Sequence, residues 1–193
     1  MNPTTYLLLA LLLLTFSYWV FRRVVKRAYQ TRGRLGPVAS LLQLFVFVAY
    51  FGFAFLYNPG EWFWFWRPSG GATPALQLAG LLLICLGFLV AFGTMGWFGM
   101  RKAFGLEAEG LTTTGPYSVS RNPQIIGGYL LVLGSIIQWP SLYALGWGLI
   151  YVLIAHWMIT TEEEHLAQIF GAEYAAYCKK VPRTIIPKKT INN

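Results

Sequence analysis

The sequence predicts an all-α integral membrane protein with about five transmembrane helices, followed by a C-terminal cytoplasmic amphipathic helix and tail. Of the 193 residues, 56% are hydrophobic and only 11% are charged, whereas about 25% of residues are charged in soluble domains. The mean hydropathy is +0.51, and the apolar runs are too long for core helices of a soluble protein. The same composition excludes disordered, collagen-like and disulfide-rich proteins.

Five apolar runs, each bounded by Pro, Gly or charged residues, are the expected spans: 6–21, 38–57, 74–100, 124–138 and 141–161. A span needs about 20 residues, and these runs bracket that length. The fourth run is short, and the turn that follows it, Trp139-Pro140-Ser141, makes it one arm of a tight helical hairpin. No repeat or separate soluble domain is visible, so we expect a single membrane domain over residues 1–193.

The basic residues predict the orientation of these spans. With the amino terminus outside, fourteen of the fifteen Lys and Arg residues lie on the inner side, and only Arg67 lies outside. Such a bias is typical of cytoplasmic segments. The net charge of +8 could also indicate nucleic-acid binding, but the basic residues punctuate apolar runs and do not form a stripe with stacking aromatic residues. We therefore expect no nucleic-acid partner, and a functional site that faces the cytoplasm.

Three carboxylates, Glu162, Glu163 and Glu164, continue the fifth helix beyond the membrane. At about 100° per residue, Glu162 and Glu163 flank an apolar face, whereas Glu164 lies on a polar face that we expect to meet water. Residues 122–178 contain no Lys or Arg that could pair with them at helical spacing. A bound cationic ligand would supply the missing charge, and a solvated helix end is the alternative.

His156 lies seven residues before Glu163 and about 20° from it around the helix. It is therefore either a catalytic base or a hydrogen-bonded structural residue. The two cysteines, Cys85 and Cys178, belong to segments at different depths. We expect neither a disulfide nor a metal site.

The second inner loop ends in Arg121-Asn122-Pro123, which opens the fourth apolar helix. Pro123 suits a first helical turn, and Asn122 suits the cap before it. Arg121 beside a helix amino terminus favours a carboxylate or phosphate ligand, although a basic residue reaching for the interface is the alternative. An anion site and a cation site at one inner face match a zwitterionic ligand.

The tail begins with Phe170-Gly171, which predicts a helix stop. The residues beyond it include Tyr174 and Tyr177 and a basic end. This segment is either an amphipathic helix on the membrane surface or a lid over the site.

Several motifs follow one another in the second half of the chain. They are Gly115-Pro116-Tyr117, Arg121-Asn122-Pro123 with Gly127, Glu162-Glu163, Phe170-Gly171 with Tyr174 and Tyr177, and Val181-Pro182. In this order and spacing they resemble the membrane methyltransferases that include isoprenylcysteine carboxyl methyltransferase and phospholipid N-methyltransferases. Three of the expected spans lie within residues 1–100. The likeness implies a methyltransferase-like catalytic core over residues 101–187, made of a loop, a helical hairpin and a cytoplasmic tail.

The resemblance implies S-adenosylmethionine as cofactor and a lipophilic or lipid acceptor that enters from the bilayer. A lipid amine, a prenyl-cysteine carboxylate, a thiol and a quinone-like phenol all fit such an acceptor. The cofactor-binding residues would be Tyr117, Arg121, Asn122, Gly127, Glu162, Glu163 and Tyr174. The catalytic candidates are Arg121, Glu163 and His156. Asn122 and Ile125 stand where the family has His and Tyr, so residue 122 cannot carry a proton near neutral pH.

Two other functions remain open from the sequence. Membrane sterol and enone reductases have similar tail motifs and use NADPH, but a phosphate-rich cofactor calls for more basic residues than Arg101, Lys102 and Arg121 provide. A non-enzymatic membrane scaffold would have to explain the inward-facing carboxylates.

Overall fold

The computed structural model describes residues 1–57, 73–99 and 110–184, and these residues are helical apart from short turns. The first helical rod consists of α1 (Pro3–Trp19), the π-helical η1 (Val20–Val25) and α2 (Lys26–Arg32). It is followed by α3 (Pro37–Tyr57) and α4 (Pro74–Phe98). The 3₁₀ turn η2 (Gly115–Ser118), α6 (Pro123–Gln138) and the long α7 (Leu142–Lys180) complete the described chain.

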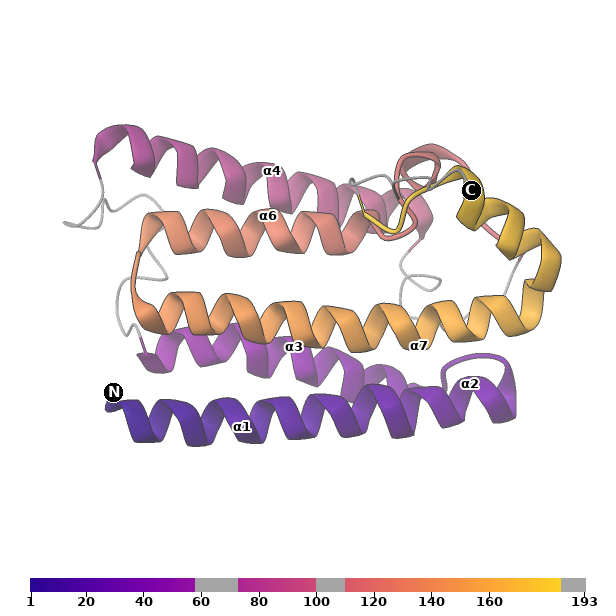
Figure 1. Cartoon of the computed structure of the whole chain (residues 1–193), viewed down its shortest axis with the longest axis horizontal. Helices are drawn as coiled ribbons and strands as arrows, with labels where there is room; N and C mark the ends of the chain where they lie inside the picture. The colour runs from indigo at the N-terminus through magenta and orange to yellow at the C-terminus, as the bar shows by residue number, and fades with distance from the viewer. Residues whose placement is uncertain (58–72, 100–109, 185–193) are drawn as a thin grey trace, which may run out of the picture.

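The helices confirm an all-α, multi-pass membrane protein. Four helical stretches are long and apolar enough to cross a bilayer: Pro3–Arg32, Pro37–Tyr57, Pro74–Phe98 and Leu142–Lys180. The fifth, α6, has 16 residues, or about 24 Å at 1.5 Å per residue, so it is shorter than a full span. It forms a hairpin with α7 across Trp139-Pro140-Ser141, as predicted, and successive long helices run in opposite directions (Figure 1). Arg67, Arg101 and Lys102, which entered the expected orientation and the comparison with reductases, lie outside the described residues.

The first basic cluster, which lies between the first two expected spans, is helical and not a loop. The helix runs on through Arg22, Arg23 and Lys26 to Arg32, and it ends at Gly33, whose φ of 65° requires the left-handed region. Arg, Lys, Ala and Gln are good helix formers, and no Pro or Gly interrupts the run before residue 33. Residues 20–32 are therefore a helical extension of α1.

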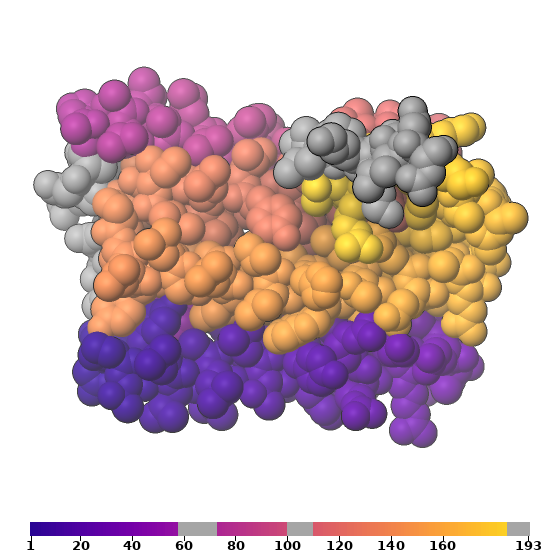
Figure 2. All heavy atoms as spheres, in the orientation of Figure 1, coloured from indigo at the N-terminus to yellow at the C-terminus, as the bar shows by residue number. Residues whose placement is uncertain are grey.

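Helices α1 and α4 form opposite edges of the molecule, with α6 and α7 between them (Figure 2). Between α4 and α6 the backbones touch, because glycines face each other across the contact. A Cβ built on Gly127 would lie 2.5 Å from the nitrogen of Ala91, and one on Gly134 would lie 2.6 Å from the carbonyl oxygen of Gly80. Close backbone packing through small residues is typical of membrane helices.

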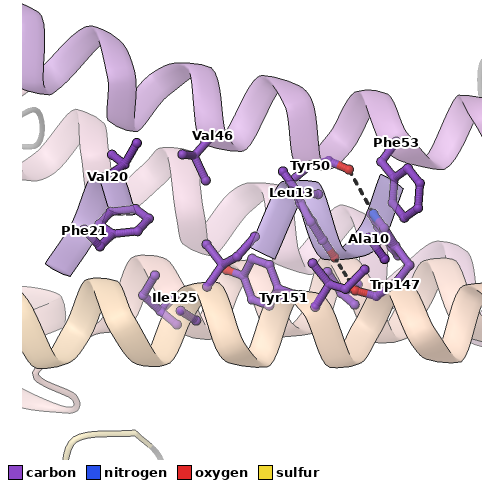
Figure 3. Packing of buried hydrophobic residues seen from close by; sticks show 14 of the residues in the cluster. Ala10, Leu13, Val20, Phe21, Val46, Tyr50, Phe53, Ile125, Trp147 and Tyr151 are labelled. Atoms are coloured by element: carbon purple, nitrogen blue, oxygen red, sulfur yellow. Dashed lines mark hydrogen bonds between the residues drawn. The ribbon is translucent and has the colours of Figure 1, made fainter. Parts of the chain in front are cut away.

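Helix α7 packs against α1 and α3 through a buried aromatic core (Figure 3). Tyr50 and Trp147 stack with ring centroids 4.8 Å apart. Trp147 Nε1 donates to the carbonyl oxygen of Tyr50 at 3.0 Å, and Tyr50 Oη donates to that of Trp147 at 3.2 Å. The polar ends of both rings are thereby satisfied inside an apolar interior, which holds α3 and α7 in a unique register.

The first 20 residues of α7, 142–161, are sufficient to cross the hydrocarbon core, so Glu162 and the residues after it lie beyond the span. The predicted helix stop is confirmed at Gly171, where φ is 44° and ψ is −113°. The helix then resumes and ends at Lys180, and its last turns point back toward the start of α6 (Figure 1). We call residues 172–183 the tail segment.

Candidate functional site

Most of the predicted site residues gather at one end of the molecule, where α1 continues into α2, α6 begins and α7 bends (Figure 1). We call this end the basic end. The site has two adjoining parts: an ion cluster under the tail segment, and a cavity between the helices.

The tail segment is attached by its backbone to the turn that precedes α6. The amide of Arg121 donates to the carbonyl oxygen of Pro182 at 3.0 Å. Ser120 Oγ and Asn122 Nδ2 both donate to the carbonyl oxygen of Arg183 at 3.1 Å. Asn122 therefore does not cap α6 with its side chain, as its sequence position suggested. Its amide instead binds the returning tail.

A second attachment comes from the tail's tyrosines. Tyr177 Oη donates to the carbonyl oxygen of Tyr117 at 2.6 Å. Tyr177 packs with Tyr174 and Val181 in a small buried cluster. Tyr117 in turn packs on Phe98 at the end of α4, with ring centroids 5.1 Å apart. The tail, the η2 turn and α4 thus form one continuous packed unit.

Glu163 is the centre of the ion cluster. Its Oε1 lies 2.8 Å from Arg121 Nη1, and the two side chains are only 14% and 11% exposed. Arg183 also pairs with it, and Arg183 Nε lies 3.1 Å from Glu163 Oε1. The inference that both carboxylates lack a protein cation is therefore wrong for Glu163. The bend at Gly171 brings Arg183 back to it, which helical spacing alone could not predict.

Arg121 is held by several groups besides Glu163. Its Nη1 donates to Tyr174 Oη at 3.1 Å and to Cys178 Sγ at 2.8 Å. Its Nε is buried and has no hydrogen-bond acceptor among the described residues. The guanidinium is thus fixed in place while one donor remains free for a ligand.

Glu162 faces a different environment, although it is the neighbour of Glu163. It lines a cavity of about 30 Å³ between the helices at the basic end. The other lining residues are Phe21, Val25, Tyr29, Leu35, Gln43, Phe98, Tyr117, Gln124 and Met158. In the part of the chain that the structure covers, no Lys, Arg or His pairs with its carboxylate. Burial first, and the nearby Glu163 carboxylate second, raise the pKa of Glu162 to about 7.

Gln124 is the second polar group of the cavity without a partner. It stands on the first turn of α6, and its Nε2 is buried with no acceptor in the described residues. A buried amide donor that is unsatisfied costs free energy, so such a group indicates a ligand or an ordered water. The cavity therefore combines a carboxylate without a cation and a donor without an acceptor.

Glu164 is exposed, as expected for the polar face of the helix, and this face also contacts the protein. Glu164 pairs with Arg22 at 3.0 Å and with Lys26 at 2.8 Å. His165 stacks on Tyr29, with ring centroids 3.9 Å apart. These contacts join α7 to the helical extension of α1, and they reflect the helical course of residues 22–32.

The remaining predicted residues are placed apart from the cavity. His156 is exposed on α7 and does not line it. Gly127 lies in the contact with α4, where a close approach of backbones accounts for a glycine. The sequence assigned no role to Gln43, Gln124 or Tyr29, although a lone Gln inside an apolar run is a usable signal for a site.

Comparisons with known proteins identify the family of the chain. The model of the phospholipid methyltransferase family matches residues 75–173, just over half of the chain. The match extends from α4 to the bend in α7, and it includes Arg121, Glu162 and Glu163.

A curated relative is similar over a longer stretch. The chain is 33% identical over 144 residues to methanethiol S-methyltransferase 2 from Bradyrhizobium diazoefficiens. The aligned stretch covers 64% of this chain and 53% of the relative, so the chain spans about half of the relative's length. No solved structure matches the chain significantly.

Proposed function

We propose that this chain, which belongs to the phospholipid methyltransferase family, is a membrane methyltransferase. It would transfer a methyl group from S-adenosylmethionine to a lipophilic acceptor at the cytoplasmic membrane face. The observation that carries the proposal is Glu162, a carboxylate that faces an inner cavity without a cationic partner in the described chain. The family favours this reaction over the reductase and scaffold alternatives.

The free polar groups of the site match the amino-acid part of the cofactor. Glu162 would accept hydrogen bonds from its ammonium group. Arg121 Nε and Gln124 Nε2 are buried donors without acceptors, and they would bind its carboxylate. S-adenosylmethionine, when bound, would supply a methyl group already activated on a sulfonium centre. Glu163 would then serve to hold Arg121 in place, with support from Tyr174.

The cavity is too small for S-adenosylmethionine, so part of the protein must move before the cofactor can bind. A space of about 30 Å³ holds only water-sized groups. Tyr117 belongs to the cavity wall and is held by Tyr177 of the tail segment. We therefore propose that the tail segment is a lid, and that its outward displacement releases Tyr117 and enlarges the site.

A small thiol is the acceptor class that we favour. The curated relative is named for methyl transfer to methanethiol, and the apolar part of the cavity wall, formed by Phe21, Leu35 and Met158, suits a small lipophilic group. A phospholipid amine, which the family name suggests, is the second candidate. Both acceptors would reach the site from the bilayer.

Two measurements on the full chain in lipid nanodiscs test the proposal. S-adenosylmethionine should raise the melting temperature in a saturable manner, and NADPH should not. Radiolabelled methyl groups should then pass from S-adenosylmethionine to a short alkyl thiol more readily than to phosphatidylethanolamine or a prenylcysteine. Stabilisation by NADPH alone would contradict the proposed cofactor. Binding of S-adenosylmethionine with transfer to phosphatidylethanolamine alone would retain the reaction and replace the acceptor.

A further inference from the structure

A second hollow lies on the outside of the basic end, away from the cavity of Glu162. It is a groove of about 390 Å³ between the helical extension of α1 and the start of α3. Its walls are formed by Trp19, Arg23, Val24, Arg27, Ala28, Thr31, Arg32, Gly36, Val38 and Ala39. None of these residues contributes to the methyl-transfer site described above.

Three guanidinium groups line this groove without any carboxylate. Arg23, Arg27 and Arg32 form no ion pair within the described chain, and no acidic residue is part of the wall. Gly36 leaves room for one of them, since a Cβ at that position would lie 2.7 Å from Arg32 Nη1. Thr31 adds a hydroxyl group to the same wall.

A neighbouring face of the same helix shows a different arrangement. Arg22 directly precedes Arg23, and Lys26 directly precedes Arg27. Arg22 and Lys26 nevertheless both pair with Glu164 of α7. The helix therefore separates its basic residues into a set that pairs with Glu164 and a set that lines the groove without an ion pair in the described chain. The positive-inside rule depends on the number of basic residues beside a span and not on the helix face that they occupy, so it does not explain this separation.

The groove also has an apolar side that continues onto the membrane surface. Trp19 is 48% exposed and stands where the apolar span ends. Val38 in the groove and Leu41 on the next turn of α3 are 69% and 63% exposed. In a bilayer these side chains meet acyl chains, and a tryptophan at this depth is typical of the interface. An occupant of the groove would thus contact guanidinium groups and hydrocarbon together.

We propose that this groove binds the phosphate headgroup of an anionic phospholipid from the inner leaflet, and that Arg23, Arg27 and Arg32 are its ligands. Guanidinium groups bind phosphate oxygens in pairs, and the negative charge of the headgroup compensates three cations that have no ion pair among the described residues. The lipid's chains extend along Val38 and Leu41. This site is independent of the methyl acceptor and of the cofactor.

Titration of the full chain in a neutral detergent tests the proposal. The probe is dioctanoyl phosphatidylglycerol, and the melting temperature is followed against its concentration. We expect a saturable increase for the unaltered chain, and an apparent affinity at least about tenfold weaker in the double variant Arg23→Gln with Arg27→Gln. Arg32→Gln alone should weaken it less, and it provides a second test if the double variant does not fold.

The matched control is Arg22→Gln with Lys26→Gln, which removes the same charge from the other face of the helix. It should have a lower starting melting temperature but an affinity for phosphatidylglycerol within about threefold of the unaltered chain. An equal loss of affinity for phosphatidylglycerol in both double variants would mean that the total surface charge, and not the groove, attracts the lipid. This result would overturn the proposal.

Two further ligands identify what the groove recognises. Dioctanoyl phosphatidylcholine has the same chains and no net charge, and it should stabilise the protein far less. Equal stabilisation by phosphatidylcholine would overturn recognition of an anionic headgroup. Saturable stabilisation by inorganic phosphate at similar concentrations would assign the groove to a soluble phosphate ligand and overturn the lipid assignment.

Discussion

Glu162 and Glu163 are adjacent in the chain but perform different tasks in the folded protein. About 100° of helix rotation separates their side chains. One therefore meets Arg121 and Arg183 under the tail segment, and the other meets the cavity wall between the helices. Only Glu162 keeps a carboxylate available for a cationic ligand.

Binding of S-adenosylmethionine should depend on pH through Glu162. Because burial raises its pKa to about 7, a cationic group must bind to a carboxylate that is only partly ionised at neutral pH. The affinity should therefore rise between about pH 6 and pH 8. Glu162→Gln should remove this dependence and weaken binding by one to two decades at pH 8, as expected for the loss of a charge-assisted hydrogen bond of about 1.5–3 kcal/mol.

Calorimetric titration at three pH values measures this effect. Glu164→Gln is the control, because Glu164 pairs with Arg22 and Lys26 and does not line the cavity. An affinity that stays constant from pH 6 to pH 8 in the unaltered chain would contradict the role of Glu162.

The same residue should lower the stability of the ligand-free protein at high pH. A folded-state pKa above the ordinary value of 4.5 means that the folded chain holds this proton more tightly than the unfolded chain. The stabilisation from the protonated form is complete below about pH 4.5 and is lost as the pH rises through about 7. Glu162→Gln should therefore increase the melting temperature at pH 8 by several degrees, with little change at pH 5, in scans without ligand.

Substitutions at Arg121 and Asn122 show which of these neighbouring residues contributes more to cofactor affinity. Arg121→Lys should reduce cofactor affinity by roughly tenfold or more, since an ammonium group cannot contact Glu163, Tyr174 and a ligand together. Asn122→His should have a smaller effect, because the Asn122 side chain binds a backbone carbonyl of the tail segment. Dissociation constants for S-adenosylmethionine would show the order, and a larger loss in Asn122→His would reverse the assignment.

A base is needed only if the acceptor must lose a proton. Glu163 is occupied by two guanidinium groups, so His156 is the remaining candidate from the sequence. Since it is exposed and outside the cavity wall, we expect His156→Gln to leave the pH dependence of methyl transfer unchanged. Loss of a rate increase between about pH 6 and pH 7 in this variant would establish His156 as the base.

At the scale of elements, the bend at Gly171 converts a straight helix into a helix with a returning arm. The positive φ of 44° is accessible to glycine at little cost. The arm then places Tyr174, Tyr177 and Arg183 over the start of α6. This one glycine thereby brings the tail segment into contact with the rest of the site.

Arg183→Gln should loosen the tail segment, because the ion pair with Glu163 is removed while the backbone contacts of residues 182 and 183 remain. Amide hydrogen exchange in residues 172–183 should become faster, and exchange in the first part of α7 should not change. Lys179→Gln is the control, since it removes the same charge at an exposed position of the same segment. Equal acceleration in both variants would show that net charge, and not the ion pair, holds the lid.

The contact of α4 with α6 should tolerate no side chain at its glycines. Gly127→Ala would place a Cβ 2.5 Å from the Ala91 nitrogen, so the helices must separate, and we expect a loss of about 1–3 kcal/mol in stability. Gly93→Ala on α4 is the control, because no described atom lies within 4 Å of its Cβ position. Thermal unfolding in detergent would measure both. A neutral Gly127→Ala would mean that the helix contact is looser than the structure describes.

For the whole molecule, the positive-inside bias predicts that the basic end lies in the cytoplasm. A cysteine introduced at the exposed residue Thr31 reports on this end. In intact cells it should react with a membrane-permeant thiol reagent and not with an impermeant one added outside. Labelling from outside would invert the topology and place the site on the other membrane face, while the arrangement of the helices would stay the same.

The sequence by itself determined the class of protein, the number and order of the helices, the α6–α7 hairpin, the stop at Gly171 and the family. These features depend on local hydropathy, on turn residues such as Pro140 and Gly171, and on motif order. Each can be read within one segment, because the hydrocarbon core demands a contiguous apolar run and backbone geometry restricts where it ends.

Only the tertiary structure decided which charged side chains form ion pairs. Glu163 is neutralised by Arg121 and Arg183, respectively 42 residues before it and 20 residues after it in the chain. Glu162 has no cationic partner in the described chain, because the same helix turns it toward the cavity wall that includes Tyr117 and Gln124. Such pairings depend on the bend at Gly171 and on the helical course of residues 22–32. They join segments remote in sequence, and a local pattern contains no information about the distance between them.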